Sequence, residues 1–287
     1  MDYGHDLRFG TFITPSSRDA LRPVRLAQAS ERLGYDLATF QDHPYQPAFL
    51  DTWTLMSFVA AATSRIRIAP NVLNLPLRPA PVLARAAASL DLLSGGRFDL
   101  GLGAGGFWDA IVAMGGRRLT PGQSIDQLEE AFDVIHGIWD TTDRTPLRGR
   151  EYYPVDGAKR GPAPAHDIPI WVGALKPRML RLIGRKADGW LPSLGYLQPG
   201  DLRSGNARID DAAADAGRDP AEIRRMLNVG GGLPADQLTA FALEDGVSTF
   251  IFVGDDESDL QRIAEEILPA VREAVTAGRA GRDAPTA

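Results

Sequence analysis

The chain has 287 residues, of which 44% are hydrophobic and 24% are charged, as is usual for a globular protein with a large core. Its formal net charge of −6 argues against a broad attraction to nucleic acid or to an anionic membrane surface. The chain has no cysteine, which excludes disulfides and thiolate sites, and its four histidines lack the spacing of metal ligands.

Apolar runs and helix-start signals divide the chain into eight strand–helix units. Strands are expected at residues 7–14, 35–40, 66–73, 98–103, 168–173, 190–194, 225–229 and 249–253. The helices that follow them are expected at residues 18–33, 51–63, 79–93, 121–139, from 177 onward, within 199–217, at 235–244 and at 256–274. Asp51 is the expected N-cap of the second helix, and prolines open several of the others.

Eight such alternations predict an α/β protein with a (β/α)8 TIM-barrel fold, formed by residues 1–275 as a single domain. Residues 140–167 break the alternation and are expected to form a lid or hairpin inserted between the fourth helix and the fifth strand. Residues 276–287 are small, polar or basic, and a disordered tail is expected there.

Chemistry in a TIM barrel is placed at the carboxyl ends of the strands. The residues expected there are Asp42, His43 and Tyr45 after the second strand, Asn71 and Val72 after the third, Ala104, Gly105, Gly106 and Phe107 after the fourth, and Gly173, Ala174, Lys176 and Arg178 after the fifth. Such a mouth, poor in ionisable groups, suits a large planar cofactor. His43 is the candidate catalytic residue, as a hydrogen-bond or proton donor; the alternative is a histidine satisfied by loop carbonyls.

The glycines of the fourth strand admit two interpretations. Gly101, Gly103 and Gly106 match the G-x-G-x-x-G pattern of an NAD(P)-dependent dehydrogenase. That fold needs a long helix directly after the glycines and an acidic strand end about 20 residues later, whereas residues 107–114 give at most a short helix. We therefore favour glycines that let the backbone approach a ring or a phosphate in a barrel.

A second glycine site precedes the fifth helix. Gly173 and Ala174 end a strand, and Lys176 and Arg178 flank the following helix start, where free amides and the helix dipole favour a phosphate. The alternative is a tight turn with solvated cations.

Taken together, these motifs resemble the luciferase-like superfamily of flavin- and deazaflavin-dependent oxidoreductases. The matching segments, in chain order, are Asp42-His43-Pro44, Asn71-Val72-Leu73, residues 92–98 (LLSGGRF), residues 101–105 (GLGAG), residues 168–174 (IPIWVGA) and residues 187–190 (ADGW). The ordered set extends over about the whole barrel.

The resemblance implies an oxidoreductase that binds reduced FMN or coenzyme F-420 over the barrel mouth. It implies a ring-facing role for His43 with Asp42 beside it, a non-proline cis peptide at Asn71-Val72, and phosphate contacts at residues 104–106 and 173–174. It also implies a homodimer. No apolar run of transmembrane length and no visible signal peptide lead us to expect a cytoplasmic location. A small-molecule substrate is expected, with neither a nucleic-acid nor a membrane partner.

The chain departs from the deazaflavin-dependent sugar-phosphate dehydrogenases of this superfamily. Their tryptophan after the histidine and their glutamate after the glycine run correspond to Ala48 and Gly106. Substrate reduction or oxygenation is therefore expected rather than alcohol oxidation, and a non-catalytic cofactor-binding barrel is a further alternative. We rank F-420 ahead of FMN, because a set of cations could line an exit for its anionic tail, although they could equally form a solvated basic surface. These cations are Arg117, Arg118, Arg148, Arg150, Lys159 and Arg160.

Overall fold

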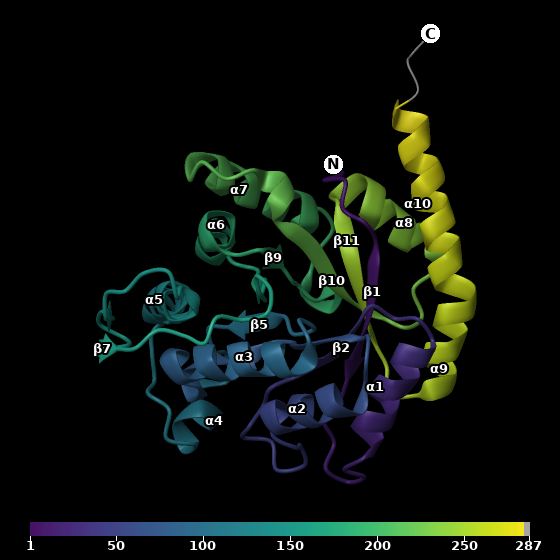
Figure 1. The fold of residues 1–287 in the computed structure, drawn as a ribbon. Coiled ribbons are helices and arrows are strands. Elements are labelled where there is room, and N and C mark those ends of the chain that lie inside the picture. The colour runs from purple at the N-terminus through teal and green to yellow at the C-terminus, as the bar shows by residue number, and fades with distance from the viewer. Residues whose placement is uncertain (284–287) are drawn as a thin grey trace.

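The computed structural model describes residues 1–283, with side chains to residue 281, as a barrel of parallel strands enclosed by helices (Figure 1). Its sheet has the order β3-β2-β1-β11-β10-β9-β8-β5-β4. The strands are β1 (Arg8–Ile13), β2 (Leu37–Phe40), β3 (Arg67–Pro70), β4 (Leu73–Asn74), β5 (Leu100–Gly103), β8 (Ile170–Val172), β9 (Gly189–Trp190), β10 (Arg224–Gly230) and β11 (Val247–Val253).

The barrel closes because β3 and β4 are two halves of one strand position. β3 pairs with β2, and β4 pairs with β5, each in parallel register. A parallel bridge between Ile68 and Phe98 completes the seam. The predicted TIM barrel is thus confirmed, with eight strand positions, but the single strand expected at residues 66–73 is interrupted at Asn71 and Val72.

The helices cover the outside of the barrel. They are α1 (Arg22–Arg32), α2 (Thr52–Ala62), α3 (Ala80–Ser94), α4 (Trp108–Ala113), α5 (Pro121–Trp139), α6 (Pro177–Lys186), α7 (Asp201–Asp215), α8 (Ala235–Asp245), α9 (Glu257–Arg262) and α10 (Leu268–Asp283), with a π-helical turn at Ile263–Ile267 and short 3-10 turns η1 (Leu75–Leu77), η2 (Leu194–Tyr196) and η3 (Pro220–Glu222). Asp51 caps α2 as predicted, since its carboxylate accepts the Thr54 amide at 2.9 Å. No helix in the described part is long and apolar enough to cross a membrane.

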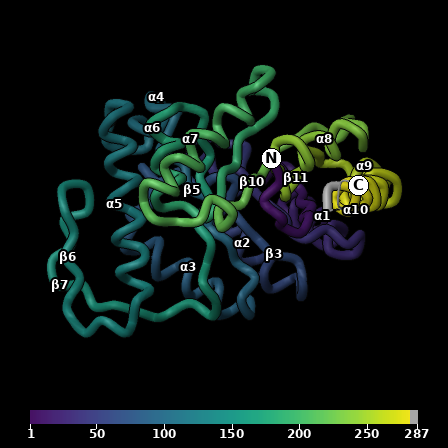
Figure 2. Tube along the Cα trace, turned by 90° about the horizontal axis from the view of Figure 1, so that it is seen from above, coloured from purple at the N-terminus to yellow at the C-terminus, as the bar shows by residue number. Residues whose placement is uncertain are grey.

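The insertion at residues 140–167 contains the predicted hairpin, an antiparallel pair of β6 (Leu147–Arg148) and β7 (Asp156–Ala158). Figure 2 shows it projecting from the barrel beyond α5. Its inner turn is held by the carboxylate of Glu130 on α5, which accepts the backbone amides of Arg150, Tyr152 and Tyr153 at 2.7–2.9 Å.

The disordered tail expected from residue 276 is wrong as far as residue 283, because α10 continues to Asp283; residues 284–287 lie outside the described part. The helix persists because it packs against the start of the chain and α8. Arg279 donates to Asp2 at 2.9 and 3.0 Å and to the His5 carbonyl at 2.9 Å. Gly278 lies directly against the Leu243 side chain.

Candidate active site

At the carboxyl end of β2, Asp42 and His43 have different surroundings. The Asp42 carboxylate is 1% exposed and accepts the Arg78 guanidinium at two points, both 2.8 Å, and the Asn74 amide at 2.9 Å. Arg78 also contacts Asp51, the cap of α2, at 2.6 Å. Asp42 therefore ties β2, β4 and α2 together, and its carboxylate is not free to bind a ligand directly.

His43 lies in a cluster of aromatic rings at the mouth. Its ring stacks on Tyr45 with centroids 5.4 Å apart and on Phe49 at 6.4 Å, and it meets the edge of Phe107 at 5.4 Å. Burial lowers the pKa of His43 below its usual value, and the nearby Asp42 charge opposes that shift. The imidazole is therefore largely neutral at pH 7, and its aromatic neighbours limit the access of water.

The Asn71–Val72 peptide bond is cis, as the resemblance implied. The Val72 side chain lies over the ends of the neighbouring strands. A Cβ on Gly103 would approach Val72 Cγ2 at 2.8 Å, and one on Gly101 would meet the Pro70 carbonyl oxygen at 2.2 Å. These two glycines thus make room for the β3–β4 junction, whereas we expected them to let the backbone approach a ring or a phosphate. Gly173 borders the same side chain at ordinary contact distance, 3.5 Å.

A buried polar network, missed at the sequence level, joins this junction to the opposite side of the barrel. The amides of Asn71 and Asn228 exchange two hydrogen bonds, at 2.7 and 3.1 Å. Asn71 also donates to Thr39 at 3.2 Å, and Asn228 donates to Ser193 at 3.1 Å. Asn228 is a polar residue within the apolar strand β10, and that interruption was the available signal in the sequence.

The loop after β5 is open toward solvent. Gly105 has φ +95°, and its position is bounded by Pro76 and Trp108. Next to it, Gly106 has no atom within 4 Å of a Cβ built on it, and Ala104 precedes them partly buried. Phe107 begins the approach to α4 and is 62% exposed. The six-residue α4 is too short for a dinucleotide-binding helix, which is consistent with the barrel interpretation.

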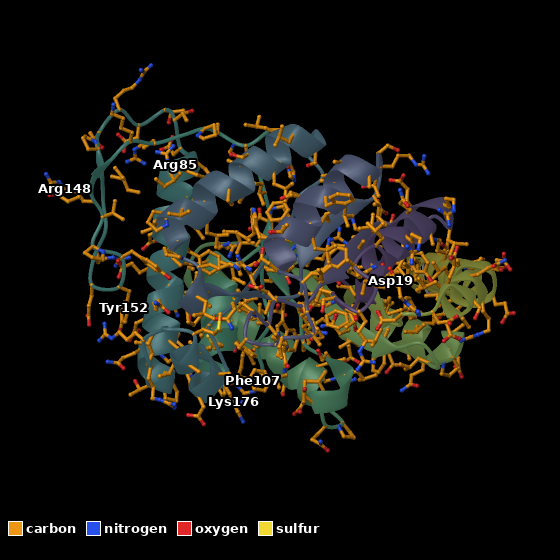
Figure 3. All side chains as sticks on the ribbon, turned by 90° about the horizontal axis from the view of Figure 1, so that it is seen from below. Asp19, Arg85, Phe107, Arg148, Tyr152 and Lys176 are labelled. Atoms are coloured by element: carbon orange, nitrogen blue, oxygen red, sulfur yellow. The ribbon has the colours of Figure 1, made fainter. Side chains whose placement is uncertain are left out.

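The structure separates the residues of the second predicted phosphate site. Gly173 and Ala174 follow β8, and the Ala174 carbonyl accepts the Trp190 indole at 2.8 Å. Lys176 is exposed as the N-cap residue of α6. Arg178 is instead paired with Asp126 on α5 at 2.5 Å. Figure 3 shows Lys176 and Phe107 at neighbouring positions in that view, with Arg148 far from both on the hairpin.

The match to a known family decides the broader assignment. Residues 7–230 match the family described as luciferase-like monooxygenase. The chain belongs to the luciferase-like monooxygenase family. Among curated relatives, an uncharacterized protein of Mycobacterium tuberculosis is 32% identical over 222 residues, covering 70% of this chain and 74% of that protein. A phthiodiolone/phenolphthiodiolone dimycocerosates ketoreductase of the same species is 34% identical over 214 residues, and the matched part spans about half of its length (52%).

Solved structures show the same luciferase-like barrel at low identity. An F-420-dependent secondary alcohol dehydrogenase superposes with a TM-score of 0.81 at 17% identity, covering 93% of this chain and 99% of that one. A long-chain alkane monooxygenase gives 0.79 at 13% identity, covering 94% and 92%. A monooxygenase from Streptomyces bottropensis gives 0.74 at 18%, covering 92% and 99%.

Features of the mouth fit a flavin-type ring and its phosphate. Asn74, at the end of β4, has a buried Oδ1 with no hydrogen-bond partner, a free acceptor for a ring N–H. The open side of Gly106 leaves space at the backbone for a phosphate. His43 adds a ring that can face the cofactor.

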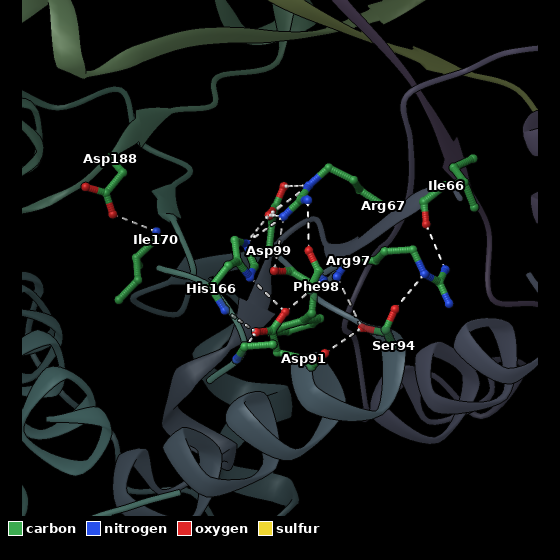
Figure 4. Close-up of polar contacts among 12 residues, drawn as sticks. Ile66, Arg67, Asp91, Ser94, Arg97, Phe98, Asp99, His166, Ile170 and Asp188 are labelled. Atoms are coloured by element: carbon green, nitrogen blue, oxygen red, sulfur yellow. Dashed lines mark hydrogen bonds and ion pairs between the residues drawn. The ribbon is translucent and has the colours of Figure 1, made fainter. Parts of the chain in front are cut away.

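The amino ends of the strands carry a separate ion network (Figure 4). Arg67 pairs with Asp99, and His166 approaches Asp91 at 2.9 Å. This network fastens the returning end of the insertion to α3, because Asp91 also accepts the amides of Ala165 and His166 at 2.7 and 3.1 Å. His166 therefore holds the end of the insertion against α3. No group of three metal-binding side chains occurs among the residues that the structure describes.

Proposed function

We propose that this luciferase-like protein binds reduced F-420 or FMN over the barrel mouth and reduces the carbonyl group of a small organic substrate. The observation that carries the proposal is the position of His43, a half-buried imidazole within an aromatic cluster that follows β2, the strand paired with β3 just before the Asn71–Val72 junction. The name of the ketoreductase relative supports carbonyl reduction as the reaction. The match to the secondary alcohol dehydrogenase supports it further, because that enzyme has the same barrel fold.

When bound, the reduced cofactor supplies a hydride to the carbonyl carbon. His43 hydrogen-bonds the carbonyl oxygen and delivers a proton there as negative charge develops, so that a ketone becomes a secondary alcohol. Its lowered pKa makes the imidazolium a stronger acid, and because that form is the minor one at pH 7, reduction should be faster at lower pH. Asn74 orients the ring, residues 104–106 and 173–174 receive the phosphate, and Phe107 excludes water from the mouth.

We rank F-420 ahead of FMN, although the cations expected to line its exit are largely engaged. Arg148 pairs with Asp156, Arg150 with Asp133, and Arg160 with Asp143. Among the cations near the mouth, exposed Lys176 is the better placed to meet an anionic tail. Oxygenation with FMN is the second candidate, favoured by the monooxygenase barrels.

Titration of the protein with each oxidised cofactor, followed by absorbance, tests the binding. Tighter binding of F-420 than of FMN, with an advantage that shrinks at high salt, supports the ranking. Anaerobic oxidation of reduced F-420 by a panel of ketones supports reduction, whereas oxygen-dependent turnover of reduced FMN supports oxygenation. Cofactor binding without turnover under either condition would indicate a non-catalytic barrel.

We also propose a homodimer. Apolar side chains on the outer faces of α2 and α3 are unusually exposed: Phe58 is 57% exposed, Val82 67% and Leu93 86%. The two helices are neighbours in the ring around the barrel (Figure 1). An apolar face of this kind is typical of a protein–protein contact, and a second copy of the chain is the proposed occupant.

A further inference from the structure

A small cavity lies inside the barrel at the amino ends of the strands, opposite the mouth. Its volume is about 10 Å³, about the room that one buried water molecule needs. Its polar lining residues are Arg8, Arg67, Asp99, Arg224 and Thr249. Leu37, Trp171 and Met226 also line it, and they belong to the apolar cluster that fills the barrel interior. That cluster separates the cavity from the proposed active site.

One of the three lining arginines has its charge balanced. Nε of Arg67 donates to both carboxylate oxygens of Asp99 at 3.1 Å (Figure 4), and Nη1 donates to the Gly96 carbonyl at 3.0 Å. Asp99 is 1% exposed and is the single carboxylate among the described residues that line the cavity. Its charge is therefore matched by Arg67, which leaves no lining carboxylate for the other two arginines.

Arg8 and Arg224 have no anionic partner. Nη1 of Arg224 donates to neutral oxygens, which are the Asp6 carbonyl at 3.0 Å and the hydroxyls of Ser248 at 3.3 Å and Thr249 at 3.4 Å. The partly buried side chain of Arg8 makes no hydrogen bond or ion pair with any residue that the structure describes. Its guanidinium nitrogens are not sealed from solvent either, so a ligand can reach them.

These two guanidinium groups come from the strands on either side of β11. Arg8 on β1 lies in register with Thr249 of β11, and Arg224 reaches the Thr249 hydroxyl from β10. Burial, together with the positive charge of Arg8, lowers the pKa of Arg224 to about 10. The shift is opposed, but not cancelled, by the carboxylates of Asp6, Asp99 and Asp36. Two like charges held in this way destabilise the fold unless an anion lies between them.

We infer that this cavity is a binding site for one small inorganic anion, chloride, held between the guanidinium groups of Arg8 and Arg224. A guanidinium offers five N–H donors, and the acceptors found for Arg224 engage only its Nη1, so donors remain for the ion. Chloride is little larger than water and matches the size of the cavity, whereas phosphate does not. The bound ion ties β1 to β10 across β11. The inference does not rest on the proposed carbonyl reduction.

The line width of the chloride NMR signal, which broadens when the ion binds a protein, measures this site on the whole chain. We expect saturable broadening with the wild type and binding about tenfold weaker or worse in Arg8→Gln and in Arg224→Gln, since each removes a charged donor. Arg8→Lys keeps the charge and should retain part of the affinity. Arg144→Gln removes the same charge from an exposed position in the insertion, so this matched control should bind chloride as the wild type does.

Melting temperatures at constant ionic strength separate a bound ion from charge screening. Replacement of gluconate, which is too large for the cavity, by chloride should raise the wild-type melting temperature by about 2–4 °C and leave Arg8→Gln unchanged. In gluconate, Arg8→Gln should melt at or above the wild-type temperature, because it removes the repulsion with Arg224; a purely structural role for Arg8 would make it melt lower. Equal wild-type melting temperatures in the two salts, wild-type chloride affinity in Arg8→Gln, or an equal loss of affinity in Arg144→Gln would overturn the inference.

Discussion

The guanidinium of Arg78 grips the carboxylate of Asp42 through two 2.8 Å contacts, directly beside the residue we assign as the proton donor. Because both side chains are largely withdrawn from water, this pair both fixes the end of β2 and compensates the Asp42 charge that His43 experiences. The pKa of His43 and the geometry of the mouth thus depend on Arg78, which acts through Asp42. Within the described residues, no direct contact joins Arg78 to the His43 ring.

Removal of the Arg78 side chain should change both the pKa of His43 and the stability of the fold. Arg78→Ala leaves the Asp42 carboxylate buried and unpaired, which costs about 3–5 kcal/mol. The uncompensated Asp42 charge should raise the pKa of His43, measurable as an upward shift in its NMR titration. Arg78→Lys should recover part of both effects. An unchanged His43 titration in a folded Arg78→Ala protein would refute the electrostatic link.

Substitution of His43 itself should affect turnover far more than folding. We expect His43→Ala to lower ketone reduction about a hundredfold, the usual loss for a general acid. The melting temperature should change little, because the ring is only partly buried. His136→Ala, at a histidine on α5, serves as the control. Equal rates for His43→Ala and wild type would remove His43 from the mechanism.

The pH dependence follows from the lowered pKa of His43. The acid form exists below that pKa, which lies under the ordinary 6.5, so ketone reduction should fall as pH rises through it. Oxidation of the alcohol product, which needs the neutral base, should instead fall as pH drops. The pH dependence of the rate, measured for ketone reduction and for alcohol oxidation in the wild type and in His43→Ala, tests this. An unchanged pH dependence in His43→Ala would show that another group titrates.

Substitutions at two glycines near the mouth should affect different properties, the stability of the fold at Gly101 and cofactor affinity at Gly106. Gly101→Ala places a Cβ 2.2 Å from the Pro70 carbonyl oxygen, so the backbone must move and the melting temperature should drop sharply. Gly106→Val meets open space, so the fold should be retained while cofactor affinity falls. Thermal melts and cofactor titrations of the two variants check the pair. Normal cofactor affinity in Gly106→Val would move the phosphate elsewhere.

The proposed dimer can be tested at Leu93. A charge at this exposed position on α3 does not disturb the core, but it cannot be buried unpaired between two copies. Sedimentation should therefore show a dimer for the wild type and a monomer for Leu93→Glu. Leu21→Glu, at an exposed leucine before α1, should remain dimeric. A monomeric wild type contradicts the proposal.

Periodicity and caps predicted most of the barrel, because parallel barrel strands are continuous apolar runs and helix starts carry proline or a cap such as Asp51. They could not predict how residues far apart in the chain share one site. Arg78 was missed because its partner Asp42 lies 36 residues earlier. Gly101 and Gly103 were assigned to a ligand because the sequence does not show that Val72 and Pro70 occupy that space.

The contact of Val72 with Gly103 also limits the order in which this barrel can change over generations. Any side chain at residue 103 collides with a methyl group of Val72, so alanine there becomes acceptable only after residue 72 has become smaller. The reverse order passes through an overpacked intermediate. The two positions are therefore epistatic, and natural variants of this chain should enlarge residue 103 only on a background in which residue 72 is already reduced.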